Sequence, residues 1–109
     1  MKQGDVYWCH FPVPIGRRPA IVLTRDDLVR RLTTVTLVPI TRSRRGIRSR
    51  VQLGPADGLP APCEAGLDSV YTVPQSLIEN YITHLSPERM REVAEALDFA
   101  LGLPALRGD

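Results

Sequence analysis

Short apolar segments separated by turn residues make up most of this chain. Several of them are rich in β-branched or aromatic residues, a composition that favours β-strands. The run at 19–24 is continuously apolar, which predicts a strand buried on both faces. In the run at 33–41, Pro39 lacks a backbone N–H, so we expect this strand to form an edge or to carry a bulge. The expected strands span residues 4–11, 19–24, 33–41, 50–53, 69–73 and 81–84.

Polar segments connect these strands. Residues 25–31 are mostly charged, with Asp26 and Asp27 between arginines, and they are expected to form a polar turn or a single helical turn. Residues 54–66 are rich in Gly and Pro, which predicts an irregular loop. Residues 42–50 are expected to form an exposed hairpin loop that is strongly basic, because it carries Arg42, Arg44, Arg45, Arg48 and Arg50.

One amphipathic helix is predicted near the end of the chain. Ser86 is a good N-cap, and Pro87 and Glu88 follow at positions that suit the first helical turn. Gly102 and Pro104 are expected to end the helix. Its expected apolar face consists of Met90, Val93, Ala94, Leu97, Ala100 and Leu101. These elements predict one domain over residues 1–109, mainly β with α: a small curved sheet or open barrel with a C-terminal helix.

Composition narrows the classes of protein to consider. The apolar fraction is 43%, which argues against a disordered chain. No apolar run is long enough to span a membrane, and no signal peptide is apparent, so we expect a cytoplasmic protein without membrane contact. Cys9 and Cys63 are isolated, as is typical of reduced thiols. His10 and His84 lie far apart in the sequence, so we expect neither a metal nor another cofactor.

A candidate phosphate site follows from two neighbouring strands. Arg18 begins the apolar run at 19–24, and Thr41 ends the run at 33–41. If these strands are adjacent, a guanidinium and a hydroxyl meet at one rim of the sheet. A guanidinium offers a planar fork of donors that matches phosphate, and a hydroxyl adds one further donor.

The chain resembles the MazF/PemK family of toxin endoribonucleases. Its matching segments keep the family's order and spacing: GDVYW at 4–8, RPAIVL at 18–23, VPIT at 38–41, DSV at 68–70, Gln75, LSPERM at 85–90 and ALDFALGL at 96–103. The resemblance implies an SH3-like barrel with a C-terminal helix, assembled as a homodimer. It also implies metal-independent cleavage of single-stranded RNA and inhibition by a cognate antitoxin, for which we expect an acidic protein.

The resemblance also suggests roles for individual residues. Arg18 and Thr41 match the family's catalytic Arg and Thr, and Asp68 and Ser69 match its Asp-Ser pair. His10 is a candidate general acid or base because histidine is the residue type most often used for proton transfer in catalysis, although an ordinary exposed histidine would give the same pattern. The residues expected to bind RNA are Arg17, Arg42, Arg44, Arg45, Arg48 and Gln75.

Two alternative functions remain open. The loop at 12–17 is short and Pro74 precedes Gln75 where the family often has an acidic residue, so an inactive module that binds RNA or protein is one alternative. The other is a gyrase-binding toxin of the CcdB type, whose activity needs a C-terminal Trp-Gly-Ile. This chain instead ends with residues 106–109, Leu-Arg-Gly-Asp, which argues against that function.

Overall fold

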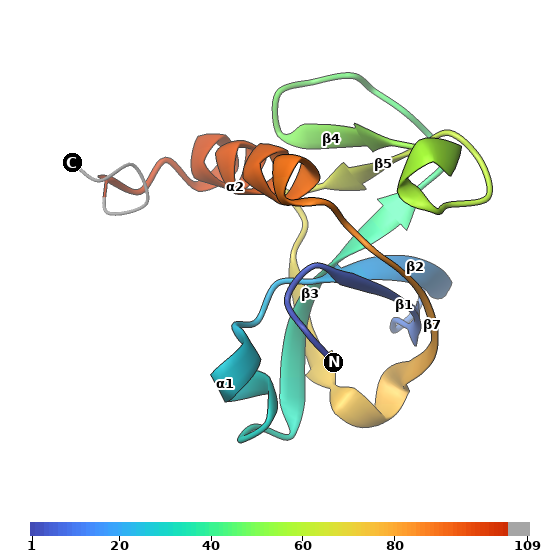
Figure 1. Cartoon of the computed structure of the whole chain (residues 1–109), viewed down its shortest axis with the longest axis vertical. Coiled ribbons are helices and arrows are strands. Elements are labelled where there is room, and N and C mark those ends of the chain that lie inside the picture. Colours follow the sequence, from blue (N-terminus) through green and yellow to red (C-terminus); the bar gives the residue numbers. More distant parts are fainter. Residues whose placement is uncertain (105–109) are drawn as a thin grey trace.

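The computed structural model describes residues 1–104 and shows a strongly curved sheet with one long helix beside it (Figure 1). Residues 106–109, which bear on the CcdB alternative, lie outside the described residues. All strand pairs are antiparallel, and the order along the sheet is β4-β5-β3-β2-β1-β7, with β6 paired to β3. The sheet is therefore open, as the sequence predicted. The strands are β1 (Asp5–His10), β2 (Arg17–Val22), β3 (Thr34–Thr41), β4 (Arg50–Leu53), β5 (Cys63–Gly66), β6 (Tyr71–Pro74) and β7 (Ile78–His84).

The long strand β3 lies at the centre of the sheet, so its expected place at an edge is wrong. It pairs with β2 along one side, and along the other side with β6 and then β5. The β6 ladder ends at Leu37 and the β5 ladder begins at Ile40. Pro39 falls between these two ladders, where its missing N–H costs no hydrogen bond on that side.

Two loop predictions also need correction. The end of the expected irregular loop forms β5, whose four residues are all buried. The basic segment is exposed at residues 42–48 as expected, but it is not a hairpin loop, since it joins β3 to β4 and β5 lies between those strands. The loop therefore crosses over one end of the sheet (Figure 1).

The helix α2 (Pro87–Leu101) begins and ends where the sequence predicted. The Ser86 hydroxyl accepts a hydrogen bond from the Arg89 N–H, and Gly102 ends the helix in the left-handed conformation with φ of 64°. The buried face differs in detail, because Val93 and Ala96 are buried whereas Ala94 and Leu101 are exposed. The short helix α1 (Asp26–Val29) and the 3₁₀ turns η1 (Pro55–Asp57) and η2 (Gln75–Leu77) complete the elements.

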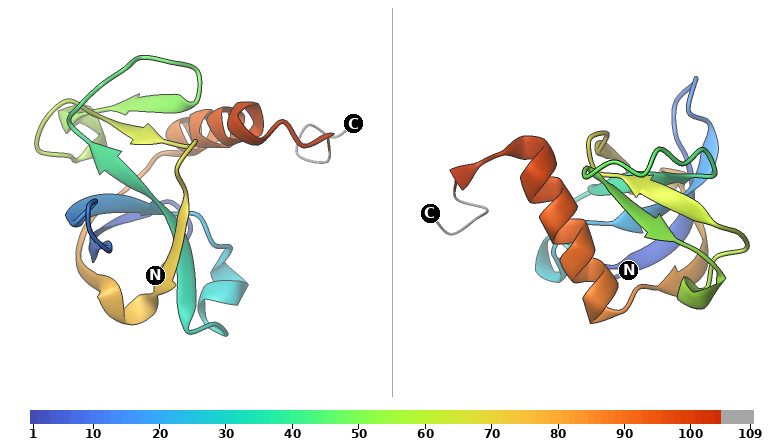
Figure 2. Two further views of the ribbon diagram at one scale, coloured as in Figure 1. Left: turned by 180° about the vertical axis from the view of Figure 1, so that it is seen from behind. Right: turned by 90° about the horizontal axis from the view of Figure 1, so that it is seen from above.

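The strand β2 separates two hydrophobic clusters. Ile21 contributes to a core that also includes Val38, Leu85 and Val93, which lies between the sheet and α2. Ala20 and Val22 point to the other face and pack in a second core with residues such as Leu37. Successive side chains of β2 therefore point into different cores, which confirms the prediction of a strand buried on both faces. Figure 2 shows α2 against one side of the curved sheet.

The segment between β4 and β5 is fixed to the rest of the fold through η1. Thr83 of β7 donates a hydrogen bond to the Asp57 carbonyl at 3.0 Å, and Arg89 Nε of α2 donates to Asp57 Oδ1 at 2.9 Å. Gly58 adopts φ of 91° and lies so close to Thr83 that a Cβ there would collide with it. The residues that follow, Leu59 to Ala61, are thereby held beside the end of β2.

None of the helices within residues 1–104 is long and apolar enough to cross a membrane. In the same residues, no three His, Cys, Asp or Glu side chains come together as metal ligands do.

Candidate active site

Arg18 and Thr41 lie side by side at the end of the β2–β3 ladder. The ladder ends with Ala20 paired to Pro39, and Arg18 and Thr41 lie two residues beyond this pair on β2 and β3. Both side chains line the same two cavities. The sequence prediction that a guanidinium and a hydroxyl share one rim of the sheet is therefore confirmed.

The two cavities extend from Arg18 and Thr41 in different directions. The first, which we call the Tyr71 cavity, has a volume of 330 Å³ and is also lined by Ile15, Arg50, Ser69 and Tyr71. The second, the Trp8 cavity, has a volume of 350 Å³. Its lining comes from β1, β2, the basic loop and the segment before β5, and includes Trp8, Arg17, Arg42, Ser43, Pro60 and Ala61. The guanidinium and the hydroxyl thus lie where the two cavities meet.

The Arg18 guanidinium is oriented but keeps its charge available. Its Nε donates to the Ile15 carbonyl at 3.1 Å, which fixes the side chain against the loop between β1 and β2. Within residues 1–104, no carboxylate forms an ion pair with Arg18. Its positive charge is therefore not neutralised by the protein, as a site for an anion requires.

The Thr41 hydroxyl is positioned by the next turn of chain. Its Oγ1 accepts a hydrogen bond from the Ser43 N–H at 3.2 Å. Because the oxygen acts as acceptor in this contact, the hydroxyl proton remains able to point at a ligand.

Glu64 on β5 holds the basic loop in place through hydrogen bonds to its backbone, a role that the sequence did not reveal. It pairs with Thr41 in the β3–β5 ladder, and its side chain is fully buried. Its Oε1 accepts from the backbone N–H groups of Arg45 at 2.8 Å and Gly46 at 3.3 Å. The segment that follows Thr41 is thereby tied to a strand in the core.

The carboxylate of Glu64 remains ionised although it is buried. Burial alone raises its pKa, but hydrogen bonds from Gln52, the Arg45 amide, Arg50 and the Gly46 amide outweigh burial and lower the pKa to about 2. The contact from Arg50 Nη1 to Glu64 Oε2 is 2.7 Å long.

Arg50 does not belong to the exposed basic surface, contrary to the sequence prediction. Its side chain is 15% exposed and forms ion pairs with Glu64 and Asp68. Asp68 also accepts from the Ser49 hydroxyl at 3.2 Å, so the Asp68 carboxylate serves this network. Ser69, the next residue, lines the Tyr71 cavity.

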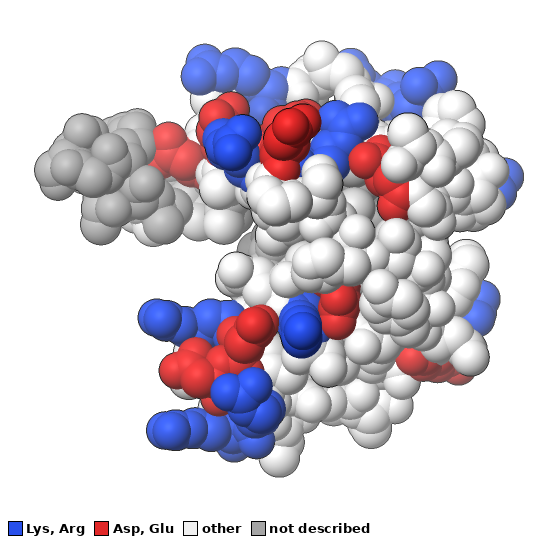
Figure 3. Space-filling model, in the orientation of Figure 1, with Lys and Arg blue, Asp and Glu red and all other residues white. Residues whose placement is uncertain are grey.

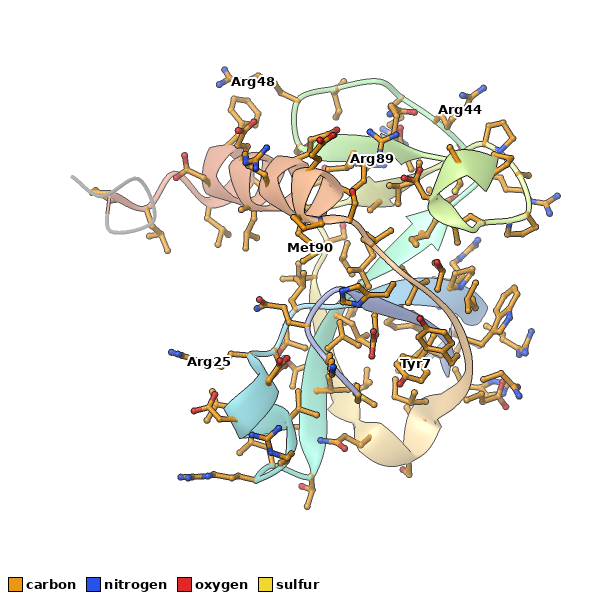
Figure 4. All side chains as sticks on the ribbon, viewed as in Figure 1. Tyr7, Arg25, Arg44, Arg48, Arg89 and Met90 are labelled. Carbon is orange, nitrogen blue, oxygen red and sulfur yellow. The ribbon has the colours of Figure 1, made fainter. Side chains whose placement is uncertain are left out.

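The other loop arginines are exposed but spread widely. Arg42 lines the Trp8 cavity, directly after Thr41. Arg44 and Arg48 lie at opposite ends of the loop (Figure 4). Arg48 leans toward α2, where its Cζ lies 4.5 Å from the centre of the Phe99 ring. Figure 3 shows the basic side chains of this region along the upper edge of the molecule.

His10 and Arg17 form an exposed cluster around Glu79. His10 Nε2 lies 2.7 Å from Glu79 Oε2, and Arg17 Nε donates to Glu79 Oε1 at 2.8 Å. The hydrogen bond from Arg17 is the main cause that lowers the pKa of Glu79. Arg17 lines the Trp8 cavity, whereas His10 lines neither cavity. The structure thus does not bring His10 to Arg18 and Thr41.

Gln75 lies at a different place in the fold. Its side-chain amide donates to the carbonyls of Val29, Leu32 and Thr34 at 2.9–3.1 Å. These contacts fix the connection between α1 and β3, and Gln75 lines neither cavity. The structure gives this residue a role in holding the scaffold.

Comparison with known proteins agrees with this arrangement. Residues 2–101 match the family model described as PemK-like, MazF-like toxin of type II toxin-antitoxin system. The chain is 34% identical to the probable endoribonuclease MazF2 of Mycobacterium tuberculosis over 103 residues, which cover 94% of this chain and 99% of that protein. It is 38% identical to the probable endoribonuclease MazF5 of the same species over 100 residues, or 91% of each chain.

Solved structures show the same fold. The Mycobacterium tuberculosis toxin MazF-mt6 superposes with a TM-score of 0.84 and 28% identity, covering 91% of this chain and 97% of the toxin. A mycobacterial endoribonuclease in complex with its cognate antitoxin superposes with a TM-score of 0.84 and 29% identity, covering 95% of this chain and 97% of that one. The match over residues 2–101, together with these relatives, shows that the chain belongs to the PemK/MazF family of type II toxins.

Proposed function

We propose that this protein is the toxin of a type II toxin–antitoxin system and cleaves single-stranded RNA as an endoribonuclease. The observation that carries the proposal is the juxtaposition of Arg18 and Thr41 where two cavities meet. This is a site for a phosphate with room for a nucleotide on either side. The names of the relatives, probable endoribonucleases of similar length, support the same activity.

The proposed reaction uses the substrate's own 2′-hydroxyl as nucleophile. The 2′-oxygen releases its proton to solvent water and bonds to the adjacent phosphorus, while the bond from phosphorus to the 5′-oxygen breaks and that oxygen takes up a proton from solvent water. The products are a 2′,3′-cyclic phosphate and a 5′-hydroxyl. Negative charge builds on the non-bridging oxygens as the five-coordinate phosphorus forms, and the oriented Arg18 guanidinium is placed to stabilise it.

Thr41 has a complementary role in this reaction. A hydroxyl is a weak base without an activating neighbour, and the contact of Oγ1 is to a backbone N–H, which does not activate it. Thr41 therefore acts as a hydrogen-bond donor to a phosphate oxygen. Neither role requires a metal ion, and we expect cleavage to proceed without one.

The exposed loop arginines supply a surface for the RNA backbone and for an antitoxin. Arg42, Arg44 and Arg45 follow Thr41 directly, and all three are exposed. Such a surface attracts phosphates regardless of sequence. An acidic antitoxin segment that binds the same charges would exclude RNA, and one structural relative is described in complex with its cognate antitoxin. We expect both interactions to take place in the cytoplasm.

We also infer that the protein forms a homodimer through an apolar hollow between α1 and α2. The hollow has a volume of 550 Å³ and is lined by Leu23, Leu28, Leu32, Val70, Leu97 and Leu101. Leu32 and Leu101 are 47% and 51% exposed, which is unfavourable for side chains that face only water. Figure 3 shows the hollow between α2 and the charged side chains around α1.

End mapping of cleaved RNA tests the proposed function. The purified protein is incubated with a mixed-sequence single-stranded RNA in buffer containing EDTA, and the new ends are identified by their reactivity with kinase and phosphatase. We expect 2′,3′-cyclic phosphate and 5′-hydroxyl ends, which Arg18→Ala should form at a rate lower by about 100-fold or more. RNA that is bound but never cut by the wild type would instead indicate a binding module.

A further inference from the structure

The side chains of Trp8 and Arg17 form a stacked pair at the wall of the Trp8 cavity. The β1–β2 ladder pairs Trp8 with Pro19 and His10 with Arg17, so Trp8 and Arg17 are diagonal neighbours on one face of the sheet. The Arg17 Cζ lies 4.2 Å from the centre of the indole ring. This distance is typical of a guanidinium plane lying against an aromatic ring.

The Arg17 plane is held from a second direction by Glu79. The hydrogen bond from Arg17 Nε to Glu79 Oε1 is 2.8 Å long, while the side chain remains 45% exposed. An ordered yet exposed planar group needs little further ordering to bind a ligand, so binding to it costs little conformational entropy.

The same ion pair makes Arg17 a poor phosphate ligand. Glu79 lies directly against its guanidinium and offsets its charge, whereas no carboxylate in residues 1–104 pairs with Arg18. A phosphate near Arg17 would also approach the Glu79 carboxylate. Of the two neighbouring arginines, Arg18 suits the anion and Arg17 suits a ligand that is flat and uncharged.

The rest of the Trp8 cavity is consistent with such a ligand. Leu59, Pro60 and Ala61 contribute uncharged lining, and the charged side chain of Arg42 lies in the same cavity together with Arg18 and Thr41. Its volume of 350 Å³ falls in the range of about 300–1,000 Å³ that is typical of small-molecule sites. A nucleotide whose phosphate is held by Arg18 and Thr41 would place its base in this space.

We propose that the Arg17–Trp8 pair is a stacking shelf for the nucleobase next to the scissile phosphate. The proposal rests on the proposed RNA cleavage. It adds Arg17 as a residue that positions the base of the substrate in the Trp8 cavity. Arg17 acts through its plane and not through its charge. Glu79 is a positioning residue, which holds the guanidinium over the indole ring.

The test combines variants of the shelf with RNA that lacks single bases. A short single-stranded RNA containing one mapped cleavage site is made uncleavable with a 2′-deoxy nucleotide at the attacking position. Abasic nucleotides are placed in turn on each side of the scissile phosphate. Binding of every RNA to wild type, Arg17→Lys, Trp8→Ala and the control Arg91→Lys is measured by fluorescence anisotropy.

We expect one flanking abasic position to weaken binding to the wild type by about 5- to 150-fold, the effect of removing one stacked base. Arg17→Lys keeps the charge but removes the plane, and it should weaken binding to intact RNA by a similar factor. With the abasic RNA, Arg17→Lys and Trp8→Ala should cause no further weakening. Arg91 is exposed on α2, and Arg91→Lys should bind every RNA as the wild type does.

Two results would overturn the shelf while leaving the proposed function intact. One is full affinity of Arg17→Lys for intact RNA together with weaker binding by Arg17→Gln, which would make Arg17 a charge contact. The other is an Arg17→Lys variant whose affinity falls by the same factor for the abasic RNA as for the intact RNA. A wild type that neither binds nor cuts RNA would overturn both proposals.

Discussion

Arg50 Nη1 donates a 2.7 Å hydrogen bond to Glu64 Oε2, and this pair connects the cavity side of the sheet to the loop above it. Glu64 is fully buried and also receives the amides of Arg45 and Gly46. The pair thus explains how an exposed, strongly basic loop is kept in one arrangement beside Thr41.

Replacing Glu64 with Gln should destabilise the protein. The change leaves the Arg50 guanidinium buried with Asp68 as its remaining carboxylate, and breaking such a pair typically costs about 3–5 kcal/mol. Urea unfolding of wild type and Glu64→Gln measures this cost. A difference below about 1 kcal/mol would show that the pair contributes little to folding. Glu95→Gln, at an exposed position on α2 where no ion pair forms within residues 1–104, is the control.

The same carboxylate should make stability fall in acid. The folded protein holds the pKa of Glu64 at about 2, below its ordinary value of 4.5. Between these values the unfolded chain binds more protons than the folded one, so stability decreases as pH falls from 4.5 toward 2. The stabilisation removed is on the order of 3 kcal/mol. The difference between wild type and Glu64→Gln should therefore shrink over this range and be constant above about pH 5–6.

Removing the Arg18 guanidinium should abolish most catalysis without unfolding the protein. Removal of one oriented donor at a developing charge typically costs about 100- to 1,000-fold in rate. Its one described structural contact, to the Ile15 carbonyl, is worth about 1 kcal/mol. Single-turnover cleavage rates are compared among the wild type, Arg18→Ala and the control Arg91→Ala. Thermal melting of the same three proteins is measured in parallel. A folded Arg18→Ala with wild-type turnover would refute the catalytic role.

The hydroxyl of Thr41 should be more important for turnover than for stability. Thr41→Val keeps the branched shape and removes the donor, and Thr41→Ser keeps the donor and removes a methyl group. We expect turnover to fall by about tenfold or more in Thr41→Val and to be largely retained in Thr41→Ser. If both variants cut at the same rate, the hydroxyl serves only to cap the Ser43 amide.

The site illustrates which features a sequence can reveal. Arg18 and Thr41 were predictable because apolar strand patterns locate both ends of β2 and β3, and adjacent strands bring those ends together. Glu64 was not, because a single Glu among Gly and Pro residues is typical of a surface loop. Its burial depends on a four-residue strand, and the hydrogen-bond partners of its carboxylate lie 12–19 positions away in the sequence.

The basic loop shows a similar limit. Sequence proximity groups five arginines, but their partners come from elements distant in the chain. Arg50 turns inward to Glu64 and Asp68, and Arg48 turns to Phe99 of α2. Composition gives the charge of such a loop, whereas tertiary contacts decide which of its charges face a ligand.

Because the loop arginines differ in their contacts, we expect their substitutions to have unequal effects on RNA binding. Arg44→Gln and Arg45→Gln should each weaken binding to all single-stranded RNAs and reduce the log–log salt slope by about 0.7 for each phosphate that the variant no longer binds. Arg48→Gln should leave the slope unchanged, because its guanidinium lies over Phe99. Titrations at several salt concentrations give the slopes.

An acidic antitoxin peptide extends the comparison. If it uses the same charges, Arg44→Gln and Arg45→Gln should slow its association more than they speed its dissociation. Equal salt slopes for the wild type and all three variants would mean that the loop is only solvated and that the RNA backbone binds elsewhere.

The apolar hollow between α1 and α2 should be the dimer interface. Burying it requires two copies to bring Leu32 and Leu101 out of water, and a carboxylate at either position would have to lose its hydration, with Arg25 as the one charged side chain among the described residues that line the hollow. We expect multi-angle light scattering to give a dimer mass for the wild type at micromolar concentration. Leu32→Glu and Leu101→Glu should give a monomer mass. Both side chains are about half exposed, so neither change should disturb the fold of the single chain.

Val13 provides the matched control for this experiment. It is 90% exposed in the loop between β1 and β2, and Val13→Glu adds the same charge outside the hollow. This variant should remain a dimer. A Leu101→Glu variant that also remains a dimer would move the interface elsewhere, most simply to the unpaired edge of β7, where Tyr81 is 56% exposed. A monomeric wild type would refute the dimer itself, and the proposed phosphate site of a single chain would then have to suffice for cleavage.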